Sequence, residues 1–302
     1  MKEKKCILAV IQINLNGLPD DNLNKCTAWI KKAAAEGAHI ICLPELYSSF
    51  YFCQTEDPEN FKFAEPLYGK SFDVFSKMAS ELEIVVIVPF FEKRMAGVYH
   101  NSACIINVDG TAAGLYRKMH IPDDPGYYEK YYFTPGDLGF NAFQTRFARL
   151  GVLICWDQWF PEAARLVALR GAEVLFYPTA IGWHLDEKEK YGTKQLDAWM
   201  TVQRGHAVAN GIYIAAVNRV GFEQVEKSEK GIQFWGSSFI CGPQGEILAQ
   251  AGTESEEILY AAIDSEYLEL VRQNWPFLRD RRIDAYGDIV KRSIDQDSCQ
   301  KV

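Results

Sequence analysis

Short runs of aliphatic and β-branched residues alternate with segments of helical periodicity along the 302-residue chain. Residues 7–13 and 39–43 have the length of buried strands, and the segment between them places apolar residues at helical spacing until Gly37. The same patterns predict further strands over 84–88, 150–154, 173–177, 212–217 and 259–263, and helices over 71–83, 161–170, 194–209 and 264–273. This alternation predicts an α/β fold in which helices connect parallel strands.

Each half of the chain closes with a predicted β-hairpin. Residues 102–108 and 111–118 flank Asp109-Gly110, a dipeptide that tolerates the positive φ of a tight turn. Residues 237–241 and 246–250 flank a second turn, Gly-Pro-Gln-Gly. The two halves therefore predict an internal pseudo-repeat, with two sheets packed face to face between layers of helices.

No linker rich in proline, serine or glycine divides the chain, so we expect residues 1–302 to form a single domain. From about residue 274 the pattern changes to a charged and aromatic segment that includes Trp275, Arg281 and Tyr286. This C-terminal arm is expected either to be solvated or to contact another subunit.

Composition limits the classes of partner. The net charge is −8 and no basic run occurs, which argues against nucleic acid as a partner. No apolar run approaches the ~20 residues that a membrane span needs, and the N-terminus lacks a signal-peptide pattern, so we expect a soluble, cytoplasmic protein. The eight cysteines contain no C-x-x-C pair, and the five histidines never fall at i, i+4, so neither a disulfide framework nor a metal site is predicted.

Three ionisable residues stand at predicted strand ends. Glu45 follows strand 39–43, Lys118 ends the first hairpin, and Cys155 lies between strand 150–154 and a helix. Strand ends are where α/β folds place ligand sites, and a thiol at a strand-to-helix junction lies near backbone N–H groups that favour a thiolate. Position alone leaves two interpretations open: a catalytic cluster, or a core thiol with two unrelated charges.

The segments around these residues, LPEL (43–46), YRKMHIP (116–122) and LICWDQWFPE (153–162), resemble the three signature segments of the nitrilase (carbon–nitrogen hydrolase) superfamily, in the family's order. The resemblance runs from the first strand to about Tyr286. It implies a four-layer αββα sandwich that assembles into a homodimer or a larger homo-oligomer, and it implies no metal or organic cofactor. It also implies that Cys155 is the nucleophile, Glu45 the general base and Lys118 the stabiliser of the oxyanion.

The same resemblance adds residues around this trio. Glu129 matches a second glutamate that recurs between the lysine and the cysteine in many members, although a surface acid in an aromatic loop remains the alternative. The residues that the resemblance places near the substrate are Trp156, Tyr128, Thr179, Ala180 and His184.

Residues 155–165, 177–182 and 205–210 are most similar to the subfamily that hydrolyses N-carbamoylputrescine to putrescine, CO2 and ammonia in polyamine biosynthesis. His184 stands where well-known members of that subfamily have a glutamate that suits the substrate amine, so Asp186, Glu187 or Glu189 would have to replace it. His184 itself is either a substrate contact or a packed loop residue. Hydrolysis of N-carbamoyl-β-alanine, an ω-amidase or other small-amide activity, and a non-catalytic scaffold remain as alternatives.

Overall fold

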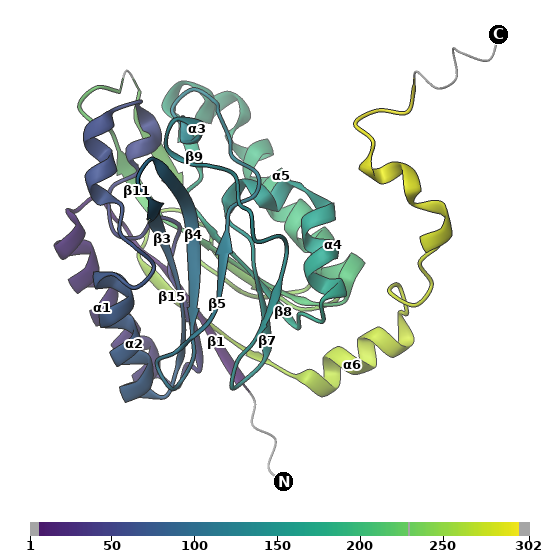
Figure 1. The fold of residues 1–302 in the computed structure, drawn as a ribbon. Coiled ribbons are helices and arrows are strands. Elements are labelled where there is room, and N and C mark those ends of the chain that lie inside the picture. Colours follow the sequence, from purple (N-terminus) through teal and green to yellow (C-terminus); the bar gives the residue numbers. More distant parts are fainter. Residues whose placement is uncertain (1–5, 229, 296–302) are drawn as a thin grey trace.

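Two six-stranded mixed sheets form the centre of the computed structural model, which describes residues 6–228 and 230–295 (Figure 1). The first sheet has the strand order β15-β1-β2-β3-β4-β5. Its strands are β1 (Cys6–Gln12), β2 (Ile40–Cys42), β3 (Val85–Met95), β4 (Val98–Ile106), β5 (Ala112–Arg117) and β15 (Glu257–Ile263). Strands β1, β2 and β3 are parallel, whereas β4, β5 and β15 pair antiparallel with their neighbours.

The second sheet has the order β14-β13-β10-β8-β7-β6. Its strands are β6 (Ala142–Gln144), β7 (Arg149–Val152), β8 (Val174–Thr179), β10 (Tyr213–Asn218), β13 (Phe239–Cys241) and β14 (Ile247–Gln250). Strands β7, β8 and β10 are parallel, and β13 and β14 continue the sheet antiparallel. Both sheets therefore contain three parallel strands followed by an antiparallel hairpin, and each has one further antiparallel strand at its other edge.

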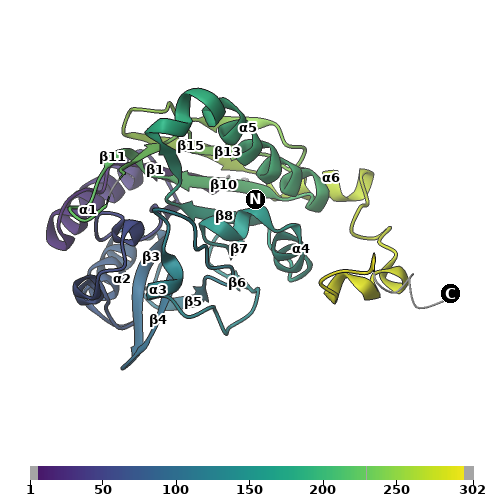
Figure 2. The same cartoon turned by 90° about the horizontal axis from the view of Figure 1, so that it is seen from above.

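The two sheets face each other, and helices cover their outer faces (Figure 2). Helices α1 (Pro19–Ala35) and α2 (Lys70–Leu82) lie on the first sheet, and α4 (Pro161–Leu169) and α5 (Leu185–Asn210) lie on the second. In β1 the alternation of side chains separates two cores: Leu8 and Val10 pack between the sheets, whereas Ala9 and Ile11 pack under the helices. Burial of both strand faces explains the continuous apolar runs in the sequence.

A third, smaller sheet joins β9 (Gly182–His184), β12 (Ile232–Trp235) and β11 (Val220–Glu223), all antiparallel. It adjoins an aromatic cluster that includes Tyr51, Phe52, Phe91 and Phe234, and short α3 (Glu129–Tyr132) contributes to the same cluster. Helix α6 (Ser265–Asn274) ends the regular structure, and the chain then leads away from the sheets through two short 3-10 turns.

Most predicted strands and helices are present, but several predicted boundaries are wrong, among them the start of β4, which lies at Val98 and not at residue 102. Helix α5 begins at Leu185, well before the predicted residue 194. The prediction was wrong because Gly192 lowers the helical propensity of the first turns, whereas tertiary packing stabilises them in the structure. The Gly192 carbonyl accepts a hydrogen bond from Nε1 of Trp183 at 3.1 Å, and a Cβ at this position would lie 3.2 Å from the same nitrogen. Strand β3 extends to Met95 and turns through Gly97 into β4, a hairpin that the sequence pattern did not indicate.

Two further properties follow from the described residues. No helix in the described part of the chain is long and apolar enough to cross a membrane. Seven cysteines lie within residues 6–228 and 230–295, and all seven are buried and free; Cys299 lies outside the described residues.

Candidate active site

The packing of the two sheets brings the ends of three strands together. Glu45 follows β2, Lys118 follows β5, and Cys155 follows β7, and all three side chains are buried. Glu129, the first residue of α3, is also buried and reaches the same point. The four residues that the sequence singled out for catalysis therefore lie in one cluster: Glu45 and Lys118 follow strands of the first sheet, Cys155 follows a strand of the second, and Glu129 comes from α3.

Lys118 lies between the two glutamates. Its Nζ is 2.8 Å from Oε1 of Glu45 and 2.6 Å from Oε2 of Glu129. Asn101 donates to Oε1 of Glu45 at 2.7 Å, and the hydroxyl of Tyr51 donates to Oε1 of Glu129 at 2.8 Å. Within the described chain, Oε2 of Glu45 has no hydrogen-bond partner, so this oxygen is free to accept a proton.

Cys155 occupies a tight turn at the start of a 3-10 helix (Cys155–Trp159). Its φ of 44° is one that residues with a side chain rarely adopt. Asp157 stabilises this turn, because its buried carboxylate accepts the backbone N–H of Ile154 at 2.9 Å. The same carboxylate accepts the hydroxyl of Tyr116 at 2.7 Å and the backbone N–H of His120 at 3.0 Å. Asp157 thus ties the segment that carries the thiol to the segment that carries Lys118.

The charges in the cluster set the protonation states. Burial raises the pKa of the Cys155 thiol well above its ordinary value; the charge of Glu45 adds to this effect and Lys118 opposes it. Burial disfavours the Lys118 ammonium, but Glu129 and Glu45 outweigh it and raise the pKa of Lys118 well above its ordinary value. At neutral pH the thiol is therefore protonated and the ammonium charged, so nucleophilic attack by this thiol needs a base.

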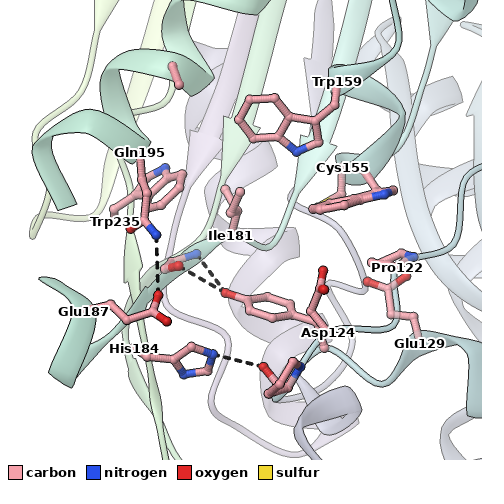
Figure 3. Close-up of a pocket in the computed structure, with 15 residues that line it drawn as sticks. Pro122, Asp124, Glu129, Cys155, Trp159, Ile181, His184, Glu187, Gln195 and Trp235 are labelled. Atoms are coloured by element: carbon pink, nitrogen blue, oxygen red, sulfur yellow. Dashed lines mark hydrogen bonds between the residues drawn. The ribbon is translucent and has the colours of Figure 1, made fainter. Parts of the chain in front are cut away.

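A cavity of about 460 Å³ opens beside the thiol. Figure 3 shows Cys155 and Glu129 on one side of it and Glu187 and His184 on the opposite side, with Asp124 between them. The wall also contains aromatic and apolar side chains, namely Tyr127, Trp156, Trp159, Ile181 and Trp235. The indole N–H groups of Trp159 and Trp235 have no hydrogen-bond partner among the described residues. The cavity therefore presents the carboxylates of Asp124 and Glu187 away from the side that carries Cys155 and Glu129.

His184 and Glu187, on the side of the cavity opposite Cys155, form hydrogen bonds with different partners. Nε2 of His184 lies 3.0 Å from the carbonyl oxygen of Pro125, so the imidazole is engaged by the wall. Glu187 stands in the first turn of α5 and accepts a hydrogen bond from Nε2 of Gln195 at 3.4 Å. Asp186 instead pairs with Lys230 at the surface. Of the three acidic residues considered as substitutes at this position, Glu187 is the one that lines the cavity.

The other residues that were expected near the substrate occupy different positions. Trp156 lines the cavity. The backbone of Ala180 forms a hydrogen bond with the Cys155 thiol, and this bond opposes part of the rise in the pKa of the thiol. Tyr128 and Thr179 do not line the cavity: the N–H of Tyr128 donates to the Cys53 carbonyl, and the Thr179 hydroxyl donates to the Tyr177 carbonyl at 3.0 Å.

Several residues of the site went unnoticed in the sequence. Asn101 and Tyr51 contact the two glutamates, and both come from segments without a recognised motif. Asp157 lay within a quoted segment, and its position two residues after the cysteine, at the start of a helical turn, was a usable signal for a capping role.

These features define a cysteine-containing α/β enzyme of the nitrilase type, and the chain belongs to the carbon-nitrogen hydrolase family, whose model matches residues 7–273. It is 45% identical over 289 residues to an N-carbamoylputrescine amidase from Arabidopsis thaliana, covering 94% of this chain and 95% of that protein. It is 42% identical over 288 residues to a citrullinase from Francisella tularensis, covering 94% and 98% of the two chains. A carbon-nitrogen hydrolase from Helicobacter pylori G27, of known crystal structure, superposes with a TM-score of 0.92 at 47% identity, covering 96% of this chain and 99% of that one.

Proposed function

We propose that this enzyme hydrolyses the carbamoyl group of a small cationic ureide, N-carbamoylputrescine, to give putrescine, CO2 and ammonia. The observation that carries the choice of substrate is the position of Asp124 and Glu187 in the cavity beside Cys155. No lysine or arginine is among the fifteen described residues that line this cavity. A carboxylate is the natural partner of a substrate ammonium, whereas a substrate carboxylate would favour an arginine.

The proposed chemistry uses the cluster as a unit. Oε2 of Glu45 takes the thiol proton as Sγ of Cys155 attacks the ureido carbon, because the thiol is protonated at rest. Lys118 and a backbone N–H near Trp156 stabilise the negative charge on the former carbonyl oxygen. Glu45 returns the proton to the departing ammonia. Water, deprotonated by Glu45, then cleaves the carbamoyl thioester, and the released carbamate breaks down to CO2 and putrescine.

Glu129 completes the proposed catalytic set as a partner of Lys118 rather than as a base. Its two oxygens are occupied by Lys118 and Tyr51, which keeps the ammonium in place between the glutamates. Trp156, Ala180 and His184 are proposed to shape the substrate site around this cluster. Tyr128 and Thr179 are proposed to act indirectly, through the backbone segments that they hold.

Citrulline is the second candidate substrate. The chain is 42% identical to a citrullinase. Citrulline also carries both a ureido group and an ammonium, so Glu187 and Asp124 suit it as well. N-carbamoyl-β-alanine lacks the ammonium and fits the two cavity carboxylates poorly.

Ammonia release from a substrate panel tests the proposal. The panel contains N-carbamoylputrescine, citrulline, N-carbamoyl-β-alanine, an ω-amide and the neutral analogue N-butylurea. We expect the highest kcat/KM for N-carbamoylputrescine and loss of turnover in Cys155→Ala, with Cys241→Ala, a buried thiol of β13, as the active control. A preference for citrulline would select the second candidate. A preference for N-carbamoyl-β-alanine, or full activity of Cys155→Ala, would overturn the proposal.

The finer architecture and the surroundings of the enzyme belong to the same proposal. We propose one domain over residues 1–302 that forms a four-layer αββα sandwich with two equivalent halves, supported by the matching strand order of the sheets. The segment after Asn274 exposes Trp275, Ile283 and Val290, which supports its use as an arm on another subunit of a homo-oligomer. We propose a cytoplasmic location, supported by the seven free cysteines of the described residues, because disulfides are rare in that compartment.

A further inference from the structure

The loop that carries Glu45 is held from the opposite half of the chain by one buried arginine. Arg219 lies between β10 and β11, and its side chain is fully buried. Its Nη2 donates to the carbonyl oxygen of Glu45 at 2.8 Å and to that of Leu46 at 3.1 Å. Its Nη1 donates to the carbonyl oxygen of Ser49 at 3.4 Å. One guanidinium therefore binds three carbonyl groups of the loop that follows β2.

The backbone of the loop is strained at Leu46, and the hydrogen bonds from Arg219 stabilise it there. Leu46 has a φ of 49°, a strained conformation that residues with a side chain rarely adopt. The two bonds from Nη2 lie on the carbonyl groups of Glu45 and of Leu46 itself, directly at the strained residue. The rigid fork of a guanidinium is suited to hold two such acceptors in fixed geometry, which a lysine ammonium is not.

Glu223 extends the support to the second glutamate of the site. Its Oε1 accepts Nη1 of Arg219 at 3.0 Å, and its Oε2 accepts the backbone N–H of Tyr51 at 2.6 Å. The hydroxyl of Tyr51 in turn donates to Glu129. The guanidinium also lies 5.9 Å from the ring centre of Tyr51 and 5.3 Å from that of Phe234. The Arg219–Glu223 ion pair thus contacts the backbone of the loop that carries Glu45, and also Tyr51, which binds Glu129.

We propose that the Arg219–Glu223 pair is a positioning device that fixes Glu45 and, through Tyr51, Glu129 relative to the thiol on the other sheet. Neither residue lines the cavity, so the pair acts through the loop and not on the substrate. The inference rests on the proposed role of Glu45 as the base. It predicts that loosening the pair lowers turnover while leaving substrate affinity in place, because displacement of a catalytic group by about 1 Å can lower the rate about 100-fold.

Arg219→Lys tests this inference because it keeps the charge and removes the fork. We expect kcat for N-carbamoylputrescine to fall about 10- to 100-fold with KM nearly unchanged. Arg272→Lys is the matched control. Arg272 lies on α6 and also binds two backbone carbonyl groups, those of Gly211 and Ala172, each at 2.9 Å. The control is expected to keep the parent kcat. Glu223→Gln, which keeps the size of the side chain, is expected to reproduce the kcat loss and serves if Arg219→Lys does not fold.

A double-mutant cycle separates positioning from a general loss of stability. In a Glu45→Gln background the base is already absent and only the support of Glu129 remains to be lost, so Arg219→Lys should lower the residual rate by a smaller factor than in the parent. An equal fractional loss in both backgrounds, or a folded Arg219→Lys enzyme with the kcat of the Arg272→Lys control, would overturn the inference. A parent enzyme that hydrolyses none of the ureides would instead contradict the proposed function, so the two failures are distinguishable.

Discussion

Lys118 and Glu129 form a fully buried ion pair in which Nζ lies 2.6 Å from Oε2. Because Glu45 shares the same ammonium, two buried carboxylates compete for one positive charge. Burial raises the pKa of Glu129 to about 7, the charge of Glu45 adds to the rise, and Lys118 limits it. As the pH falls through about 7, the cluster therefore takes up a proton. A neutral carboxyl group holds the Lys118 ammonium less strongly than a carboxylate does.

Glu129→Gln tests this coupling. In the parent enzyme we expect kcat/KM to fall on the acid side with an apparent pKa near 7, because protonated Glu129 no longer holds the ammonium as an ion pair. Glu129→Gln should lower kcat about 10- to 100-fold and remove this acid limb, because the titrating carboxyl is gone. A pH profile of kcat/KM for both enzymes provides the measurement. Persistence of the same limb in Glu129→Gln would contradict the assignment.

The stability of the protein should show the same group. Glu129 binds its proton more tightly when folded, since its pKa is raised from the ordinary 4.5 to about 7. Its contribution to folding is therefore fully present below pH 4.5 and is lost as the pH rises through about 7. Unfolding by urea at several pH values should show a decline over this interval in the parent that is smaller in Glu129→Gln.

Lys118→Met should destabilise the fold as well as abolish turnover. The substitution leaves Glu45 and Glu129 buried without their ammonium, and removing one partner of a buried pair costs about 3–5 kcal/mol. The loss should be smaller in a Glu129→Gln background, because one uncompensated charge is then absent. Urea unfolding measures both effects. Lys227→Met, at an exposed pair with Asp57, is the control and should leave the unfolding free energy nearly unchanged.

Asp157→Asn should damage the turn that carries Cys155. The new amide nitrogen cannot accept the N–H groups that the carboxylate now accepts, so a buried donor loses its partner at a cost of about 1–3 kcal/mol. We expect a lower Tm together with a lower kcat per folded molecule. Asp264→Asn is the control, because Asp264 caps α6 at a half-buried position where asparagine caps equally well. Equal effects of the two variants would contradict a special role for Asp157.

Glu187→Gln should reveal which end of the substrate the far wall binds. A charge-assisted hydrogen bond contributes about 1.5–3 kcal/mol, so KM for N-carbamoylputrescine should rise about 10- to 100-fold. KM for N-butylurea, which has no ammonium, should not change. Glu189→Gln is the matched control, because Glu189 is an exposed carboxylate on the same helix that does not line the cavity. Equal rises in KM for both ureas would exclude recognition of the ammonium by Glu187.

The sequence was informative where local pattern and position determine structure. Glu45, Lys118 and Cys155 each stand at the end of a predicted strand, where α/β folds place ligand sites. Position alone left two interpretations open, and the resemblance of the surrounding segments to a known family favoured a catalytic cluster. Asn101, Tyr51 and Arg219 carry no comparable signal. Their contacts join segments far apart in the chain, and these contacts exist only after the two sheets pack.

The third sheet shows the same limit. Strands of three or four residues, such as Gly182–His184, are too short for a period of two to be recognised. The sheet nevertheless determines the site, because it holds the wall that carries His184 and ends at Glu223. Which acidic residue faces the cavity was likewise undecided among three candidates, because the start of α5 depends on packing around Gly192 rather than on propensity.

The pairing of β15 with β1 has a consequence for synthesis of the chain. Cys6 to Gln12 emerge from the ribosome long before their antiparallel neighbours, Glu257 to Ile263. During translation one edge of β1 must therefore remain open, with its amide groups unpaired, while the residues between the two strands are made. The newborn chain closes this edge of its first sheet only after Glu257 to Ile263 have been made, so chaperones that shield exposed strand edges would have most to protect before that stage.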